Sequence, residues 1–200
     1  MSPPNPSWHG FVLHGSQYST LDSDYPGALA TELSGISPSG EIVGSSCLDD
    51  IFCLSPRFKS FIISKKGAFS HFDPPGTDLS VGSEVCNINA SGAIVGTYVG
   101  TDGVQHIYFL KNGKYTTIDY PGATGTSCGE MNDQGDIVGA YAKEDGVVHS
   151  YLLSHGVFTS FDPPGAACLN SEATGTNNAG IIIGAFGDAE CNEHGYIRTP

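Results

Sequence analysis

The stretch FTSFDPPGAACLNSEATGTNNAGIIIGAF, residues 158–186, decides the fold because both of its halves recur along the chain. Its first half, an apolar strand ended by Asp-Pro-Pro-Gly, is matched by YSTLDSDYPGA, FSHFDPPGT and YTTIDYPGA. Its second half, an Asn-Asn-Ala-Gly turn before an apolar run, is matched by GISPSGEIVG, NINASGAIVG and EMNDQGDIVG. The stretch is therefore one copy of a repeat of about 45 residues and not a dedicated catalytic loop.

Each repeat predicts four short strands. In the second copy they are SEVCNIN (83–89), AIVGTYV (93–99), HIYFL (106–110) and YTTID (115–119), rich in β-branched and aromatic residues and separated by Gly, Asn and Pro. We call these positions strands a, b, c and d. Four strands in about 45 residues are typical of a β-propeller blade.

The sequence predicts an all-β, four-bladed β-propeller that fills residues 1–200 as one domain. The blade units are 31–72, 83–119, 126–162, and 171–198 together with 9–22. The chain begins on strands c and d and ends on strand c, so we expect the N- and C-terminal strands to close the ring. One strand c is then surplus, either 9–14 or 194–198. A β-solenoid is the alternative, but it would leave exposed sheet ends.

The repeats resemble the HAF-type extracellular repeat family. The resemblance rests on the alternation of HGFVL, FTSFDPPGA and GTNNAGIIIG, and it covers the chain from His9 to Arg198. It implies a propeller-like repeat fold and an extracellular protein, and it implies no particular reaction. The chain departs from the pattern at Lys59, which replaces the histidine at the start of strand c, and in the expanded loop CLDDIFCLSPRF.

Composition narrows the class of partner. Eight basic residues against 21 acidic ones give a net charge of −13, which disfavours nucleic acid and anionic membrane surfaces. No basic and apolar leader opens the chain, so we expect no signal peptide in it. Six cysteines allow three disulfides and, with few lysines and 27 glycines, favour a secreted protein. The predicted pairs are Cys47–Cys53, Cys86–Cys128 and Cys168–Cys191.

Candidate site residues lie where strands a and c begin, on the face that carries the d–a crossings and the b–c loops. Strand a carries Glu32, Glu84 and Glu172, with Ser127 at the equivalent place in the third repeat. Converging carboxylates raise one another's pKa and suit acid–base catalysis, or they hold Ca²⁺ or another cation in the channel. Alternatively they are solvated or cap backbone amides. We expect no other cofactor and no zinc site.

Strand c begins with His9, Lys59, His106, His149 and His194, which either join neighbouring strands by hydrogen bonds or face a ligand. The Asp residues that end strand d are expected to accept hydrogen bonds from the Pro-Gly turns. Departures from the repeat are better indications of function. They are Lys59, Asn87, Ser127, Glu130 and Phe58, the last in a loop that could cover the face as a lid. Trp8 could stack on a sugar.

Two classes of function follow. The first is one small-molecule pocket on this face, which either binds a ligand or performs cofactor-independent isomerisation, cyclisation or elimination. Glu84, Glu172, Glu32 and Lys59 are its candidate catalytic residues, and Ser127, Glu130, Asn87, His106, His149, His194 and Phe58 its candidate ligand contacts. The second is a non-catalytic secreted propeller that binds a glycan, a cation or a protein, with one sugar site per blade as its clearest form. A fragment of a longer repeat array is a further alternative.

Overall fold

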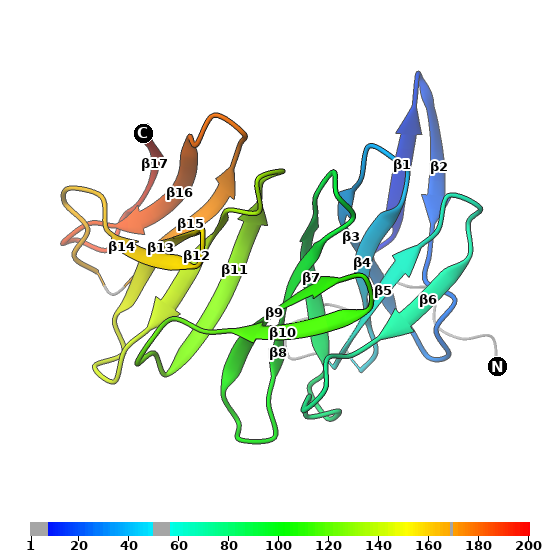
Figure 1. Ribbon diagram of the computed structural model, residues 1–200, viewed down its shortest axis with the longest axis horizontal. Coiled ribbons are helices and arrows are strands. Elements are labelled where there is room, and N and C mark those ends of the chain that lie inside the picture. The colour runs from blue at the N-terminus through cyan, green and yellow to red at the C-terminus, as the bar shows by residue number, and fades with distance from the viewer. Residues whose placement is uncertain (1–7, 50–56, 169) are drawn as a thin grey trace.

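The computed structural model describes residues 8–49, 57–168 and 170–200, in which all regular structure is β. Seventeen strands form five antiparallel sheets (Figure 1). The N-terminal hairpin is β1 (Gly10–His14) and β2 (Gln17–Leu21). Blade one is β3 (Ala30–Ile36), β4 (Ile42–Cys47), β5 (Phe58–Ile63) and β6 (Phe69–Phe72). Blade two is β7 (Ser83–Ile88), β8 (Ile94–Val99), β9 (Gln105–Lys111) and β10 (Lys114–Ile118).

The remaining strands complete two more blades. Blade three is β11 (Gly125–Met131), β12 (Ile137–Ala142), β13 (Val148–Ser154) and β14 (Val157–Phe161). Blade four is β15 (Ser171–Thr176), β16 (Ile182–Gly187) and β17 (Glu193–Arg198). The described part of the chain contains no helix that could cross a membrane. The predicted all-β, four-bladed β-propeller is confirmed, with each blade an antiparallel meander whose first strand lies innermost.

The predicted closure of the ring by terminal strands is wrong. β17 itself pairs with β16 and takes the position of strand c in blade four, and the N-terminal hairpin does not fill the strand-d position beside it. The hairpin forms a separate sheet and contacts β3 instead. Figure 1 shows the hairpin (blue) and β17 (red) at opposite ends of the row of blades, and no pairing joins them among the described residues.

The a–b turns have the same construction in every blade. A glycine with φ between 73° and 88° closes each turn, at Gly40, Gly92, Gly135 and Gly180. In blades two to four an asparagine side chain accepts backbone N–H groups of the turn, as Asn89 Oδ1 does from Ala93 N at 3.1 Å. The Asn-x-x-Gly signature is therefore a local hydrogen-bonded turn that sets the strand register.

The core lies between blades and repeats with them. The valines of the Ile-Val-Gly segments, Val43, Val95 and Val138, are completely buried, and each packs against the inner strand of the next blade. The equivalent residue of blade four, Ile183, is 50% exposed because no blade follows it in the described chain. At the other end Phe11 is 64% exposed, whereas its counterpart Phe61 is buried.

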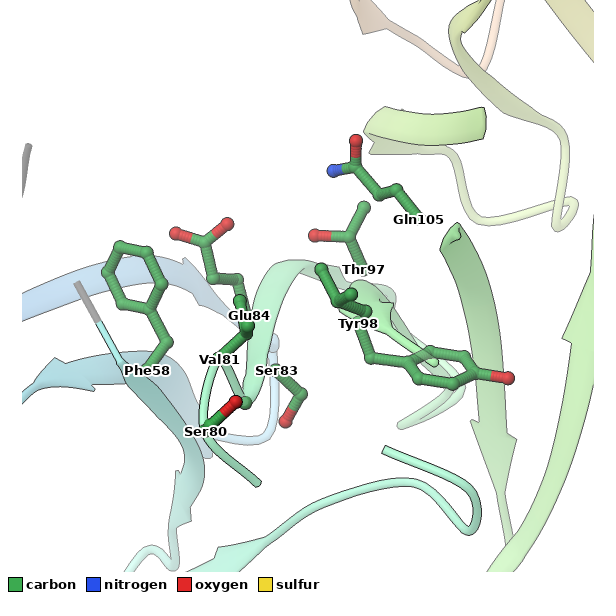
Figure 2. A pocket seen from close by; sticks show the side chains of 10 residues that line it. Phe58, Ser80, Val81, Ser83, Glu84, Thr97, Tyr98 and Gln105 are labelled. Atoms are coloured by element: carbon green, nitrogen blue, oxygen red, sulfur yellow. The ribbon is translucent and has the colours of Figure 1, made fainter. Parts of the chain in front are cut away.

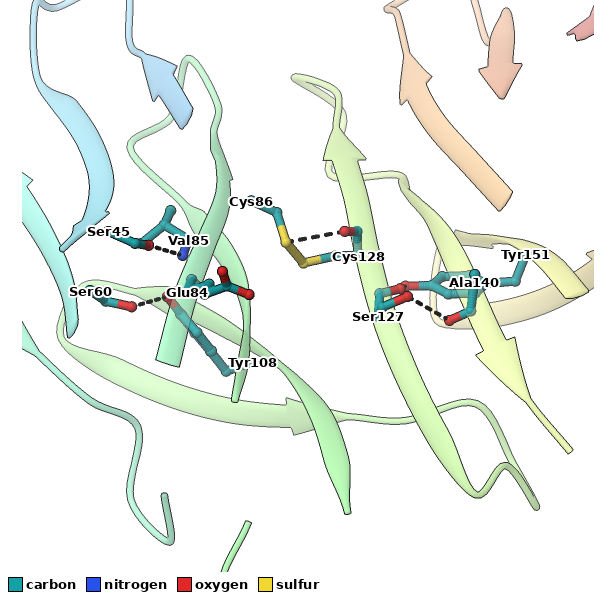
Figure 3. Close-up of a disulfide and its surroundings, with 10 residues drawn as sticks. All are labelled: Ser45, Ser60, Glu84, Val85, Cys86, Tyr108, Ser127, Cys128, Ala140 and Tyr151. Carbon is teal, nitrogen blue, oxygen red and sulfur yellow. Dashed lines mark hydrogen bonds between the residues drawn. A yellow bond between two sulfur atoms is a disulfide. The ribbon is translucent and has the colours of Figure 1, made fainter. Parts of the chain in front are cut away.

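Two predicted disulfides are confirmed. Cys168–Cys191 joins the d–a crossing of blade four to its b–c loop, and Cys86–Cys128 joins the inner strands β7 and β11 (Figure 3). Cys86 lies one residue out of register with Cys128 in the repeat, and the strands are irregular at both cysteines, with the two Cα atoms 6.2 Å apart. The predicted Cys47–Cys53 pair extends outside the described residues, as does the middle of the loop interpreted as a lid.

Candidate functional site

A backbone contact where strands c and a begin recurs at two junctions, between blades one and two and between blades three and four. Phe58, the first residue of β5, forms a parallel bridge with Gly82, just before β7, and Phe58 N donates to Val81 O at 2.8 Å. Val148 and Asn170 form the same bridge between blades three and four. Gly82 has a φ of 90° and no space for a side chain, because a Cβ there would strike the carbonyl oxygen of Phe58. The glycine therefore permits the close approach of the two blades.

This junction opens into a pocket of about 460 Å³. Figure 2 shows the Phe58 ring and the Glu84 carboxyl group beside each other, with Thr97 and Gln105 projecting to the same side. Phe58 comes from blade one, and the other three residues come from blade two. The pocket thus combines an aromatic face, a carboxyl group and two neutral polar groups at the boundary between two blades.

The carboxyl group of Glu84 is the most perturbed acid of this site. Burial, together with the smaller effect of the negative charge of Glu32 on the neighbouring inner strand, raises its pKa to about 7. Neither Glu84 nor Glu32 has a side-chain hydrogen bond or ion pair with any described residue. Glu84 is therefore available to accept or donate a proton in a hydrogen bond with a ligand.

The predicted convergence of three carboxylates occurs only in part. Glu32 and Glu84 lie close enough for their charges to interact, whereas Glu172 lines a separate pocket of about 390 Å³ in blade four. Ser127 stands between them on β11 and donates to Ala140 O at 3.3 Å (Figure 3). Within the described residues no group of three His, Cys, Asp or Glu side chains is placed to hold a metal ion, so nothing in the arrangement supports the predicted channel cation.

The side chains that begin strand c pair with the aspartates that end strand d. His9 pairs with Asp22 at 2.9 Å, and His149 pairs with Asp162 at 2.8 Å. Lys59 makes the equivalent ion pair with Asp73, so its ammonium group is already engaged. Only a small part of either side chain is exposed in that pair. These pairs tie the two outer strands together and leave Lys59 a poor candidate for a catalytic base.

His106 and His194 also pair with aspartates. His106 contacts Asp119 at 2.9 Å and Asp102 at 3.2 Å. Burial lowers the pKa of His106, but the two carboxylates outweigh burial and raise it overall. Blade four lacks a strand d in the described chain, and there His194 pairs with Asp188 of its own b–c loop at 2.7 Å. None of the predicted ligand-binding histidines, His106, His149 and His194, lines the pocket of Glu84.

Asn87 and Glu130 do not join this pocket. Asn87 lies three residues beyond Glu84, about 10 Å farther along the inner strand, and lines a hollow of about 320 Å³ at the other end of the blades. There Asn87 Nδ2 donates to Glu130 Oε1 at 3.4 Å, and Thr176 N donates to Glu130 Oε2 at 3.0 Å. These residues link three inner strands to one another.

The sequence analysis did not select Gln105 and Thr97 as contacts of this pocket. The position of Gln105 in the repeat does not indicate this pocket, because Gln105 precedes the histidine of strand c as Phe58 precedes Lys59, and in blade two that position belongs to the junction with blade three. This position begins the strand that bridges to the next blade. The residue before the histidine therefore faces the following inner strand, and its identity differs from blade to blade.

Comparison with known proteins supports the architecture. No protein-family model and no curated protein matches the sequence. Solved structures similar to the chain include TolB from Acinetobacter baumannii, with a TM-score of 0.64 and 13% identity over 94% of this chain and 44% of that one. A mutant of Aleuria aurantia lectin in complex with α-methyl-L-fucoside has a TM-score of 0.53 and 13% identity over 94% of this chain and 65% of the lectin.

A third similar structure is an arginine-to-alanine mutant of AofleA from Arthrobotrys oligospora, with a TM-score of 0.52 and 16% identity over 94% of this chain and 60% of that one. The chain therefore spans about half to two thirds of the length of these structures. At such low identity the similarity establishes the propeller fold alone, and it assigns no residue a role. The disulfides are consistent with an extracellular or periplasmic location.

Proposed function

We propose that this protein is a non-catalytic, secreted carbohydrate-binding propeller, with a sugar held between Phe58 and Glu84. The observation that carries the proposal is this pair, in which an aromatic ring and an unpartnered carboxyl group line one pocket. The C–H face of a sugar packs well on an aromatic ring, and its hydroxyl groups donate strong hydrogen bonds to a carboxylate. Thr97 and Gln105 add neutral polar groups to the same pocket.

The acidic surface agrees with a neutral ligand, because a net charge of −13 disfavours anionic partners. The lectin complexed with a fucoside supports the sugar class by analogy of fold. The resemblance to HAF-type extracellular repeats and the disulfides support secretion, since disulfides persist in oxidising compartments.

The test is a screen by saturation-transfer NMR with methyl α-L-fucoside, methyl β-D-galactoside, methyl α-D-mannoside and N-acetylglucosamine. We expect at least one of them to bind, and Phe58→Ala to weaken the affinity about tenfold through loss of stacking. Glu84→Gln should weaken binding by a similar factor above pH 7, because a hydrogen bond to a charged group becomes one to a neutral group. Glu190→Gln, in the exposed b–c loop of blade four, is the matched control. Failure of all four sugars to bind, or binding that neither variant changes, contradicts the proposal.

A specific observation favours proton-transfer catalysis as a second candidate function. A carboxyl group with a pKa of about 7 in a pocket is suited to act as a general acid or base at neutral pH. The reaction would be an isomerisation, cyclisation or elimination that needs no cofactor. Prolonged incubation with each bound sugar, followed by NMR, distinguishes the candidates. Conversion that Glu84→Gln abolishes while the ligand still binds favours the enzyme, and recovery of unchanged sugar favours the binding protein.

A further inference from the structure

The junction between the N-terminal hairpin and blade one repeats the construction of the Phe58 pocket. Thr31 N donates to Trp8 O at 3.0 Å, which places Trp8 beside the start of β3 as the bridge to Gly82 places Phe58 beside the start of β7. His9 follows Trp8 and pairs with Asp22, just as Lys59 follows Phe58 and pairs with Asp73. The two junctions are therefore structurally equivalent.

This second junction also holds a pocket. Its volume is about 530 Å³, and its lining includes Trp8, Phe11 and Glu32. Trp8 is 55% exposed and Glu32 is also exposed, so a ligand in the pocket can reach both side chains from solvent. Glu32 occupies the position in β3 that Glu84 occupies in β7, since each pairs with the equivalent residue of the adjoining strand b, Ser45 or Thr97.

The other described junctions lack this combination. Between blades two and three the equivalent positions hold Gln105 and Ser127, which provide neither an aromatic ring nor a carboxylate. Between blades three and four they hold Val148 and Glu172, and the lining of the Glu172 pocket does not include Val148. An aromatic ring and a carboxyl group therefore coincide at two consecutive junctions of the described chain.

We infer that the Trp8–Glu32 pocket is a second sugar-binding site and that each chain binds two monosaccharides of the same class on neighbouring blades. The inference rests on the proposed function of the Phe58–Glu84 pocket and extends it to a bivalent surface. Two adjacent sites on one rigid face engage a branched or clustered glycan more tightly than either site alone, since the second contact becomes intramolecular.

Trp8 is the single tryptophan of the chain, so its fluorescence reports on this pocket directly. The experiment titrates the four sugars named above into the whole chain and records both tryptophan fluorescence and calorimetric stoichiometry. We expect a stoichiometry of about two for the sugar that binds, one molecule in each pocket, together with a change in tryptophan fluorescence.

Variants separate this inference from the proposed function. Trp8→Ala and Phe58→Ala should each lower the stoichiometry by half, and the double variant should bind no sugar. His14→Ala, which removes an exposed ring of the same hairpin outside the pocket, is the control and should leave binding unchanged. One site that Phe58→Ala removes, with no fluorescence change, overturns the second site and leaves the proposed function standing. Absence of binding in every titration overturns both.

Discussion

Phe58 and Glu84 lie beside each other because the backbone of Phe58 bridges to Gly82, two residues before the glutamate. The ring belongs to one blade and the carboxyl group to the next, so neither blade alone makes the pocket. The contact between blades therefore both stabilises the fold and builds the site. This dual role makes the junction the best place to test how structure produces function.

Replacement of Gly82 should break this relationship. Gly82→Ala places a Cβ against the Phe58 carbonyl oxygen at a φ of 90°, so the two blades must separate. We expect a loss of about 2–4 kcal/mol in the free energy of unfolding, measured by urea denaturation. The matched control is Gly92→Ala in an a–b turn, where φ is 74° but nothing lies within 4 Å. Gly92→Ala should lower the free energy of unfolding by only about 1 kcal/mol, because alanine is strained in a left-handed conformation. Equal losses for the two variants would show that the blade contact adds nothing.

The raised pKa of Glu84 predicts a stability that falls as pH rises. Below pH 4.5 the carboxyl group is protonated in both the folded and the unfolded chain and contributes nothing. Between 4.5 and about 7 the unfolded chain releases its proton while the folded chain retains it, so unfolding becomes easier. Above 7 the destabilisation is constant, and we expect it to be of the order of 2 kcal/mol after allowance for partial exposure.

Glu84→Gln removes this titration and should be more stable than the parent chain at pH 8 but not at pH 4. Glu32→Gln should reduce the loss, because it removes the charge that adds to the effect of burial. Urea denaturation across pH 4–8 measures both. A stability difference between the parent chain and Glu84→Gln that does not change with pH would contradict the raised pKa.

The Cys86–Cys128 disulfide should make a large contribution to the free energy of unfolding, because it joins the inner strands of two blades and closes a loop of 42 residues. A loop of that length predicts about 3–4 kcal/mol of stabilisation from the reduced entropy of the unfolded chain. We expect the double variant Cys86→Ala and Cys128→Ala to lose that amount in thermal or urea unfolding. The matched variant at Cys168 and Cys191, separated by 23 residues, should lose slightly less. A greater loss for the second pair would show that blade four is held mainly by its own disulfide.

The repeat made the blades predictable because its turn residues and apolar strands depend on local chemistry. The Asn-x-x-Gly turns and the Ile-Val-Gly strands appear in the structure where the pattern predicts them. The fate of the terminal strands was not predictable, because β17 and β1 are both good copies of strand c and only tertiary packing decides which one pairs with β16.

Two residues of the pocket, Glu84 and Phe58, were among the candidates that the sequence offered, but their proximity was not predicted. The repeat alignment selects Glu84 as an exposed or channel-facing acid, but it treats Asn87 and Glu130 as members of the same site. The structure separates them, since three residues of extended chain carry the backbone about 10 Å to the opposite end of the blade. Phe58 could be singled out as a departure from the pattern, yet its proximity to Glu84 depends on a contact between two blades that no single repeat encodes.

The burial of the Ile-Val-Gly segments predicts how much each blade depends on the next. Val138 is completely buried between blades three and four, whereas Ile183, its counterpart in blade four, is half exposed. Val138→Ala should lower the free energy of unfolding by about 2 kcal/mol, through lost burial and the cavity left behind. Ile183→Ala removes more atoms from a site that water already reaches, and it should cost less than about 1 kcal/mol. Urea denaturation of both variants measures the difference. If Ile183→Ala proves as costly as Val138→Ala in the protein as it exists in solution, another blade covers this face, from a second copy or from a further part of the chain.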